Sequence, residues 1–147
     1  MLRIQKSAGR MVRAAIAVLL LLPACTSRPQ EHDGPLLHVK IKDFKVQPAL
    51  LSVEDGLVTL SVWNEGPSTH EFVVVPSDRL ADELPIAADG ISVDEDAVVP
   101  LDELEEIEAK ERGILSLSLS PGSYVLFCNL EGHYLAGMHA SLKVIAA

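Results

Sequence analysis

The sequence predicts an all-β domain, a sandwich of about seven strands with an acidic, partly helical insert. From Leu36 onward, apolar residues alternate with polar ones, which is the period of strands with one buried face. Gly, Pro, Asn and Asp residues separate these runs at turn positions. The chain has 147 residues, of which 48% are hydrophobic, so one compact core is expected.

The first 24 residues have the pattern of a bacterial secretory signal peptide. A head with four basic residues precedes an apolar run, 14–22, that is too short to span a bilayer. Leu22-Pro23-Ala24-Cys25 then resembles a lipobox, although Pro23 is unusual within one. This pattern predicts cleavage before Cys25 and a lipid on its sulfur. An ordinary cleavable signal and an uncleaved N-terminal anchor are the alternatives.

Cleavage at this point would define a signal peptide (1–24), a lipid-anchored tether (25–35) and a folded domain (36–147). The protein would then lie at the bacterial cell envelope, on its periplasmic or extracytoplasmic face, and contact the membrane through the lipid alone. Loss of the four basic residues would change the formal charge from −9 to −13. Cys128 would become the only free thiol, which excludes a structural disulfide and a thiolate-bridged dinuclear copper site.

The strands follow the alternation in chain order, and turn residues separate them. Pro48 follows the first strand, and Glu54-Asp55-Gly56 ends the second. The expected strands are 37–46, 50–53, 57–63, 70–75, 115–120, 124–128 and 138–144. Within the fourth, His70 shares the inward face with Phe72, whereas Glu71 points the other way.

Residues 77–112 interrupt this alternation with thirteen acidic residues against three basic ones. Asp102 and Glu105 have the spacing of a capping box, which predicts a short helix docked through Leu104 and Ile107. We expect this insert to cover one flank of the sandwich. Its charge would repel nucleic acid and favour a basic partner.

Cys128, His133 and Met138 follow one another at intervals of five, on a loop after an apolar strand. Thiolate, imidazole and thioether together suit a copper ion that cycles between Cu(I) and Cu(II). His70 is the candidate for a fourth ligand. Taken singly, a free Cys is more often a small buried hydrophobe and a lone Met a core residue, so the hypothesis rests on their convergence.

The same residues carry a family resemblance. Asn64-x-Gly66-x-x-x-His70 and Tyr124-x-x-Phe127-Cys128-x-x-x-Gly132-His133-Tyr134-x-x-Gly137-Met138 resemble the cupredoxins, the plastocyanin and azurin group, over residues 36–144. The resemblance implies a Greek-key sandwich and one type 1 (blue) copper ion. It makes His70, Cys128 and His133 the trigonal ligands and Met138 the weak axial ligand. It further implies an electron carrier and not an enzyme.

The resemblance also implies a docking surface. Leu130, Tyr134, Leu135 and Ala136 would form an apolar patch around His133 for a redox partner, such as a basic c-type cytochrome or an oxidase, and a monomer is expected. Glu71 stands where many cupredoxins carry Asn or Ser, which places the usual side-chain bond to the Cys sulfur in question. The alternative function is copper binding or delivery in envelope copper homeostasis. Such proteins carry Met- or His-rich exposed segments, whereas residues 25–147 hold a single Met.

Overall fold

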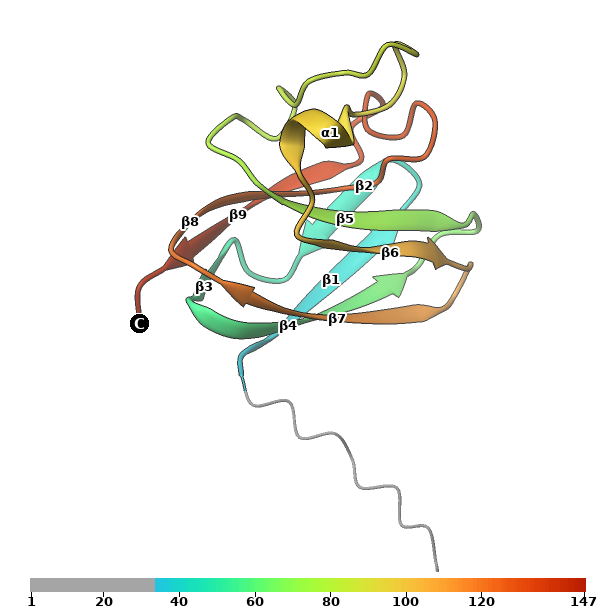
Figure 1. Ribbon diagram of the computed structural model, residues 1–147. Coiled ribbons are helices and arrows are strands. Elements are labelled where there is room, and N and C mark those ends of the chain that lie inside the picture. Colours follow the sequence, from blue (N-terminus) through green and yellow to red (C-terminus); the bar gives the residue numbers. More distant parts are fainter. Residues whose placement is uncertain (1–33) are drawn as a thin grey trace, which may run out of the picture. The chain divides into compact units, whose positions relative to one another are not determined.

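The computed structural model describes residues 34–147, which form a sandwich of two β-sheets (Figure 1). One sheet has the strand order β2-β1-β4-β7, and the other has the order β3-β9-β8-β5-β6. The elements are β1 (Leu36–Lys42), β2 (Lys45–Pro48), β3 (Ser52–Glu54), β4 (Gly56–Asn64), β5 (His70–Pro76), α1 (Glu95–Val98), β6 (Asp102–Ile107), β7 (Arg112–Leu119), β8 (Gly122–Phe127) and β9 (His139–Ile145). The predicted signal peptide, Cys25 and most of the predicted tether lie outside the described residues.

The predicted all-β sandwich is confirmed, although the described residues form nine strands where about seven were expected. One additional strand arises because the run 37–46 folds back on itself. β1 ends at Lys42, β2 begins at Lys45, and the two pair antiparallel with Ile41 opposite Val46. Buried residues fall on odd positions before this turn and on an even position after it. That change of parity is the sequence signal for a two-residue connection.

The predicted helix beginning at Asp102 is wrong. These residues form β6, an edge strand that pairs antiparallel with β5 and places Leu104 opposite Phe72. The capping-box signal is local, whereas the edge of β5 offers backbone hydrogen-bonding groups to a neighbouring strand, with one register shift between His70 and Phe72. Within residues 34–147 the one helix is α1, where the Asp94 side chain accepts a hydrogen bond from the amide of Ala97. No helix in this part of the chain has the length and apolar character needed to cross a membrane.

Apolar side chains from both sheets fill the space between them. This main core includes Val39 and Leu60 from the four-stranded sheet and Phe72 and Leu126 from the five-stranded sheet. Cys128 and Met138 belong to the same buried cluster. The core therefore continues without a break into the loop that carries the predicted ligands.

A second apolar cluster lies on the outer face of the five-stranded sheet. Val73 and Val125 on that face pack with Leu84 and Val93 of the insert. β5 and β8 are consequently buried on both faces, and this explains why their sequences are continuous apolar runs. The insert covers one flank of the sandwich, as the sequence predicted.

If this packing holds the insert in place, Leu84→Ala should destabilise the fold. Leu84 is only 4% exposed, and large-to-small substitutions at such sites cost about 2–5 kcal/mol. Leu80→Ala is the matched control, because Leu80 lies in the same segment but is 64% exposed. Its effect should stay within about 0.5 kcal/mol. Urea denaturation of both variants measures the difference, and equal effects would contradict the packing described.

Candidate metal centre

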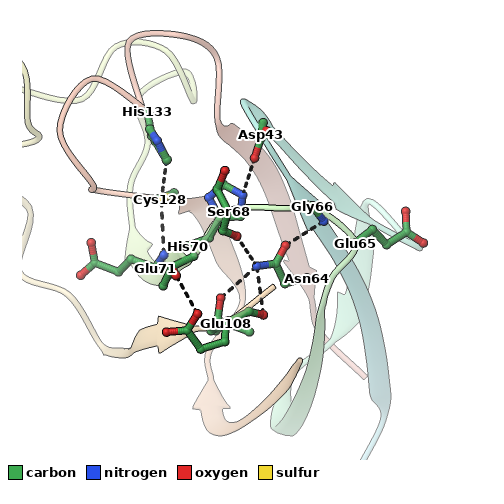
Figure 2. Close-up of polar contacts among 12 residues, drawn as sticks. Asp43, Asn64, Glu65, Gly66, Ser68, His70, Glu71, Glu108, Cys128 and His133 are labelled. Atoms are coloured by element: carbon green, nitrogen blue, oxygen red, sulfur yellow. Dashed lines mark hydrogen bonds and ion pairs between the residues drawn. The ribbon is translucent and has the colours of Figure 1, made fainter. Parts of the chain in front are cut away.

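The four predicted ligands come together where β5 begins and β8 ends. His70 is the first residue of β5, and Cys128 follows the last residue of β8. The candidate ligand atoms of His70, Cys128 and His133 lie within 4.8 Å of one another. Sγ of Cys128 is 3.4 Å from Nδ1 of His133, a contact marked in Figure 2. Two segments more than fifty residues apart in the chain thus supply one compact group of donors.

Backbone hydrogen bonds close the 128–138 loop around this point. The amide of Met138 donates to the carbonyl of His133 at 3.0 Å, and the amide of Cys128 donates to the carbonyl of Met138 at 3.1 Å. Gly132 and Gly137 have φ values of +76° and +100°, which L-residues with a side chain rarely adopt. The loop therefore returns Met138, which is fully buried, to the cluster that contains Cys128.

His70 provides a test of whether these residues fit a metal ion. Its imidazole is fully buried, and Nε2 lies 3.2 Å from Oδ1 of Asp43. Within residues 34–147, Nδ1 of His70 is the one buried side-chain nitrogen or oxygen that has no hydrogen-bond partner. Leaving such an atom unpaired is costly, and a coordinated cation removes that cost. Because thiolate, imidazole and thioether donors surround the same point, the cluster is consistent with one type 1 copper ion.

The electrostatics of the metal-free protein favour neutral side chains at this site. Burial and the neighbouring His133 lower the pKa of His70, while Asp43 acts in the opposite direction. Burial raises the pKa of the Cys128 thiol, although the backbone amides of Leu130 and Glu71 oppose that effect. A neutral imidazole is ready to bind a metal, whereas the thiol must lose its proton when the metal enters.

Glu71 contacts the cysteine sulfur through its main chain. Its backbone amide donates to Sγ of Cys128 at 3.4 Å, so this donor does not depend on the side chain that follows His70. The Glu71 carboxylate belongs to a separate group with Glu95 and Glu103, whose candidate oxygen atoms lie within 4.8 Å of one another. The Glu71 side chain thus points to the face of β5 opposite His70, as the alternation along the strand predicted. Glu71 therefore belongs to the support of the site and not to its donor set.

Asn64 anchors the loop that leads to His70. Its Nδ2 donates to the carbonyls of Ser68 at 2.7 Å and Ile107 at 2.9 Å, and its Oδ1 accepts from the amide of Gly66 at 2.9 Å (Figure 2). The side chain is fully buried. The sequence pattern included Asn64 and Gly66 but gave them no role, because two of the carbonyls that Asn64 binds, those of Ile107 and Glu108, are more than forty residues away in the chain.

Asn129 and Tyr134 join the 128–138 loop to the insert. Asn129 accepts from the amide of Val93 at 2.7 Å through Oδ1, and its Nδ2 donates to Oε1 of Glu95 at 2.7 Å. The Tyr134 hydroxyl accepts from the amide of Leu84 at 2.9 Å and donates to the carbonyl of Ala81 at 2.8 Å. The same loop therefore faces the candidate metal centre on one side and the insert on the other.

The prediction that Tyr134 contributes to an exposed patch is wrong. Tyr134 is only 2% exposed, whereas Leu130 and Leu135 are 36% and 54% exposed. Its ring packs edge-to-face on Phe127, and its hydroxyl has two hydrogen-bond partners in the insert. A local sequence pattern contains no information on that insert's position, so it could not distinguish Tyr134 from its exposed neighbours.

Comparisons with solved structures identify the fold. No protein-family model matches the chain, and no curated protein matches it in sequence. The structure is similar to dithionite-reduced auracyanin from Roseiflexus castenholzii (TM-score 0.59, 18% identity, 75% of this chain and 96% of that one). It is also similar to auracyanin A of Chloroflexus aurantiacus, described as a blue copper protein (0.53, 19%, 75% and 99%), and to rusticyanin of Thiobacillus ferrooxidans (0.51, 16%, 76% and 79%). The chain therefore has the cupredoxin fold that its sequence resemblance implied.

The carboxylate group predicts how stability depends on pH. Burial, together with the nearby carboxylates of Glu95 and Glu103, raises the pKa of Glu71 from 4.5 to about 7. The folded state therefore holds a proton that the unfolded state releases, and the stability gained from it is present below pH 4.5 and lost as the pH rises through 7. Metal-free Glu71→Gln should avoid this loss, so its stability should exceed that of the wild type at about pH 8.

Urea denaturation of metal-free protein between about pH 4 and pH 8 measures this difference. Glu54→Gln is the control, because Glu54 is exposed on β3 and lies outside the carboxylate group. Its pH profile should follow the wild type. Parallel profiles for Glu71→Gln and the wild type would contradict the assignment.

Proposed function

We propose that this protein is a type 1 copper protein that carries single electrons between redox partners and performs no substrate chemistry. The unpaired, fully buried Nδ1 of His70 is the observation that carries the proposal. The candidate ligand atoms of Cys128 and His133 lie within 4.8 Å of that of His70, and Met138 is buried in the cluster that contains Cys128. The likeness of the fold to proteins described as auracyanin and rusticyanin supports it further.

A bound copper ion would supply the one-electron redox chemistry, and the residues of the chain would set its surroundings. His70, Cys128 and Met138 are fully buried, so they would exclude water from the ion. The amide of Glu71 would donate to the thiolate and help to hold it. His133 is partly exposed and is therefore the ligand through which electrons are expected to enter and leave.

The visible spectrum of the Cu(II) protein tests this function directly. In a background in which Cys25 is Ser, we expect an intense thiolate-to-copper band that a reductant bleaches reversibly. Cys128→Ser should abolish the band, because Cys128 is the only thiol left in that background. A wild-type domain that retains copper without this band would contradict the proposal and favour the copper-delivery function.

The location that we propose is the bacterial cell envelope, on its periplasmic or extracytoplasmic face, with lipid on Cys25. The basic head, the short apolar run and the lipobox-like sequence before Cys25 support it. The 11-residue segment 25–35 would serve as the tether, and the domain would act as a monomer. Metabolic labelling with a fatty acid, lost in Cys25→Ser, is the corresponding test.

The docking patch that we propose consists of Leu130, Leu135 and Ala136, to which Phe44 adds its ring. All four are exposed, and Phe44 lies edge-on to His133 with ring centroids 5.5 Å apart. The insert with its thirteen acidic residues is attached to the same loop. A basic redox protein, such as a c-type cytochrome or an oxidase, is the partner that fits an apolar contact bordered by negative charge.

The electron self-exchange rate tests this patch without knowledge of the partner. Leu135→Asn keeps the size and charge but removes apolar surface that the encounter would bury, so the rate should fall about tenfold. Leu57→Asn is the matched control, because Leu57 is 42% exposed but lies near the start of β4, remote from His70. Line broadening in mixtures of reduced and oxidised protein measures the rate. Equal rates in the two variants would exclude the patch.

A further inference from the structure

The turn between β1 and β2 contacts both candidate histidine ligands. It consists of two residues, Asp43 and Phe44, since β1 ends at Lys42 and β2 begins at Lys45. Asp43 contacts His70, and Phe44 packs on His133. Neither contact follows from the motifs, because the turn lies 27 residues before His70 in the chain.

Phe44 indicates that this turn has a role beyond connecting two strands. Its φ of +62° is unfavourable for a residue with a side chain, and its ring is 49% exposed. A positive φ is strained for a residue with a side chain, and a ring that stays half exposed contributes little burial to offset that strain. The turn lies against the 128–138 loop. The carbonyl of Phe44 is 3.9 Å from the position that a Cβ would take at Gly137.

Asp43 fixes the proton on the buried imidazole. Its Oδ1 lies 3.2 Å from Nε2 of His70 (Figure 2), and a carboxylate can only accept a hydrogen bond. Nε2 is therefore the donor, and in the neutral imidazole the lone pair is on Nδ1. Nδ1 is the atom that has no other partner. The contact thus selects the tautomer in which His70 can bind a metal.

Gly66 leaves the space in which the Asp43 carboxylate lies. A Cβ at position 66 would be 3.2 Å from Oδ1 of Asp43 and 3.1 Å from Oδ1 of Asn64. The amide of Gly66 donates to that Asn64 oxygen, which holds the glycine in place. The Asp43 side chain is 40% exposed, and the absence of a Cβ at position 66 leaves room for its carboxylate beside His70. This arrangement gives a physical reason for the Asn64-x-Gly66 part of the motif.

We propose that Asp43 is a positioning residue for the copper site, which holds His70 in the metal-binding tautomer and strengthens its imidazole as a donor. The inference rests on the proposed function, because it assigns a role toward bound copper. A carboxylate that accepts from a ligand imidazole raises the basicity of the ring. Nitrogen donors favour Cu(II) relative to Cu(I) more than sulfur donors do. Asp43 should therefore lower the reduction potential.

The first measurement uses metal-free protein and does not depend on copper chemistry. Long-range ¹H–¹⁵N NMR reports which ring nitrogen of His70 carries the proton. The wild type and Asp43→Asn should both show the proton on Nε2, since an amide oxygen also accepts. Asp43→Ala should show a mixture of tautomers or the proton on Nδ1. An unchanged tautomer in Asp43→Ala would overturn the proposal.

The second measurement is the reduction potential of the copper-loaded protein. Asp43→Asn keeps the hydrogen bond but removes the charge, and it should weaken Cu(II) relative to Cu(I) binding about tenfold, which corresponds to a rise of about 59 mV. Glu131→Gln is the control, because it removes one negative charge from the exposed side of the 128–138 loop without contacting His70. An unchanged potential, or an equal rise in the two variants, would overturn the role of Asp43.

A further variant covers the case in which Asp43→Asn or Asp43→Ala fails to fold. Gly66→Ala keeps Asp43 but crowds its carboxylate, so it should shift the potential in the same direction by a smaller amount. An unchanged potential in folded Gly66→Ala would count against the proposal. If the wild type shows no thiolate-to-copper band, the proposed function fails. The NMR result still decides whether Asp43 sets the tautomer of His70.

Discussion

The fold holds the candidate donor atoms of His70, Cys128 and His133 close together, and the first two of these residues are fully buried. Nδ1 of His70 has no hydrogen-bond partner there, and burial disfavours ionisation of the Cys128 thiol. Such an arrangement opposes folding on its own, so the surrounding contacts must impose it. A metal ion that binds these atoms would remove this cost to folding, because it would bind Nδ1 of His70 and replace the proton of the Cys128 thiol.

Three sets of contacts impose the arrangement from different directions. Asn64 fixes the loop before His70 to β6. Asn129, the residue directly after Cys128, is hydrogen-bonded to the insert. The turn at Asp43 contacts His70 from the four-stranded sheet. Both sheets and the insert therefore meet at the donor group. Rigid support of this kind suits electron transfer, since a ligand geometry that hardly changes between two oxidation states keeps the reorganisation energy small.

Much of the donor set could be predicted from the sequence because its signals are local. Cys128, His133 and Met138 lie on one loop at regular spacing, and His70 falls on the inward parity of its strand. Asp43 and Asn129 could not be predicted in the same way, since each acts through a partner 27 or more residues away. The error on Tyr134 has the same origin, because its hydroxyl bonds to residues about fifty positions earlier in the chain.

The sequence by itself determined the all-β class, the strands of alternating period and the residues that supply the donors. These features depend on the order of neighbouring residues, which alternation and spacing reveal directly. The tertiary structure decided that residues 102–107 form an edge strand and not a helix, and that the insert buries the outer face of β5 and β8. It also decided which residues support His70. Each of these outcomes depends on backbone edges and apolar surfaces that become neighbours only when distant segments pack together.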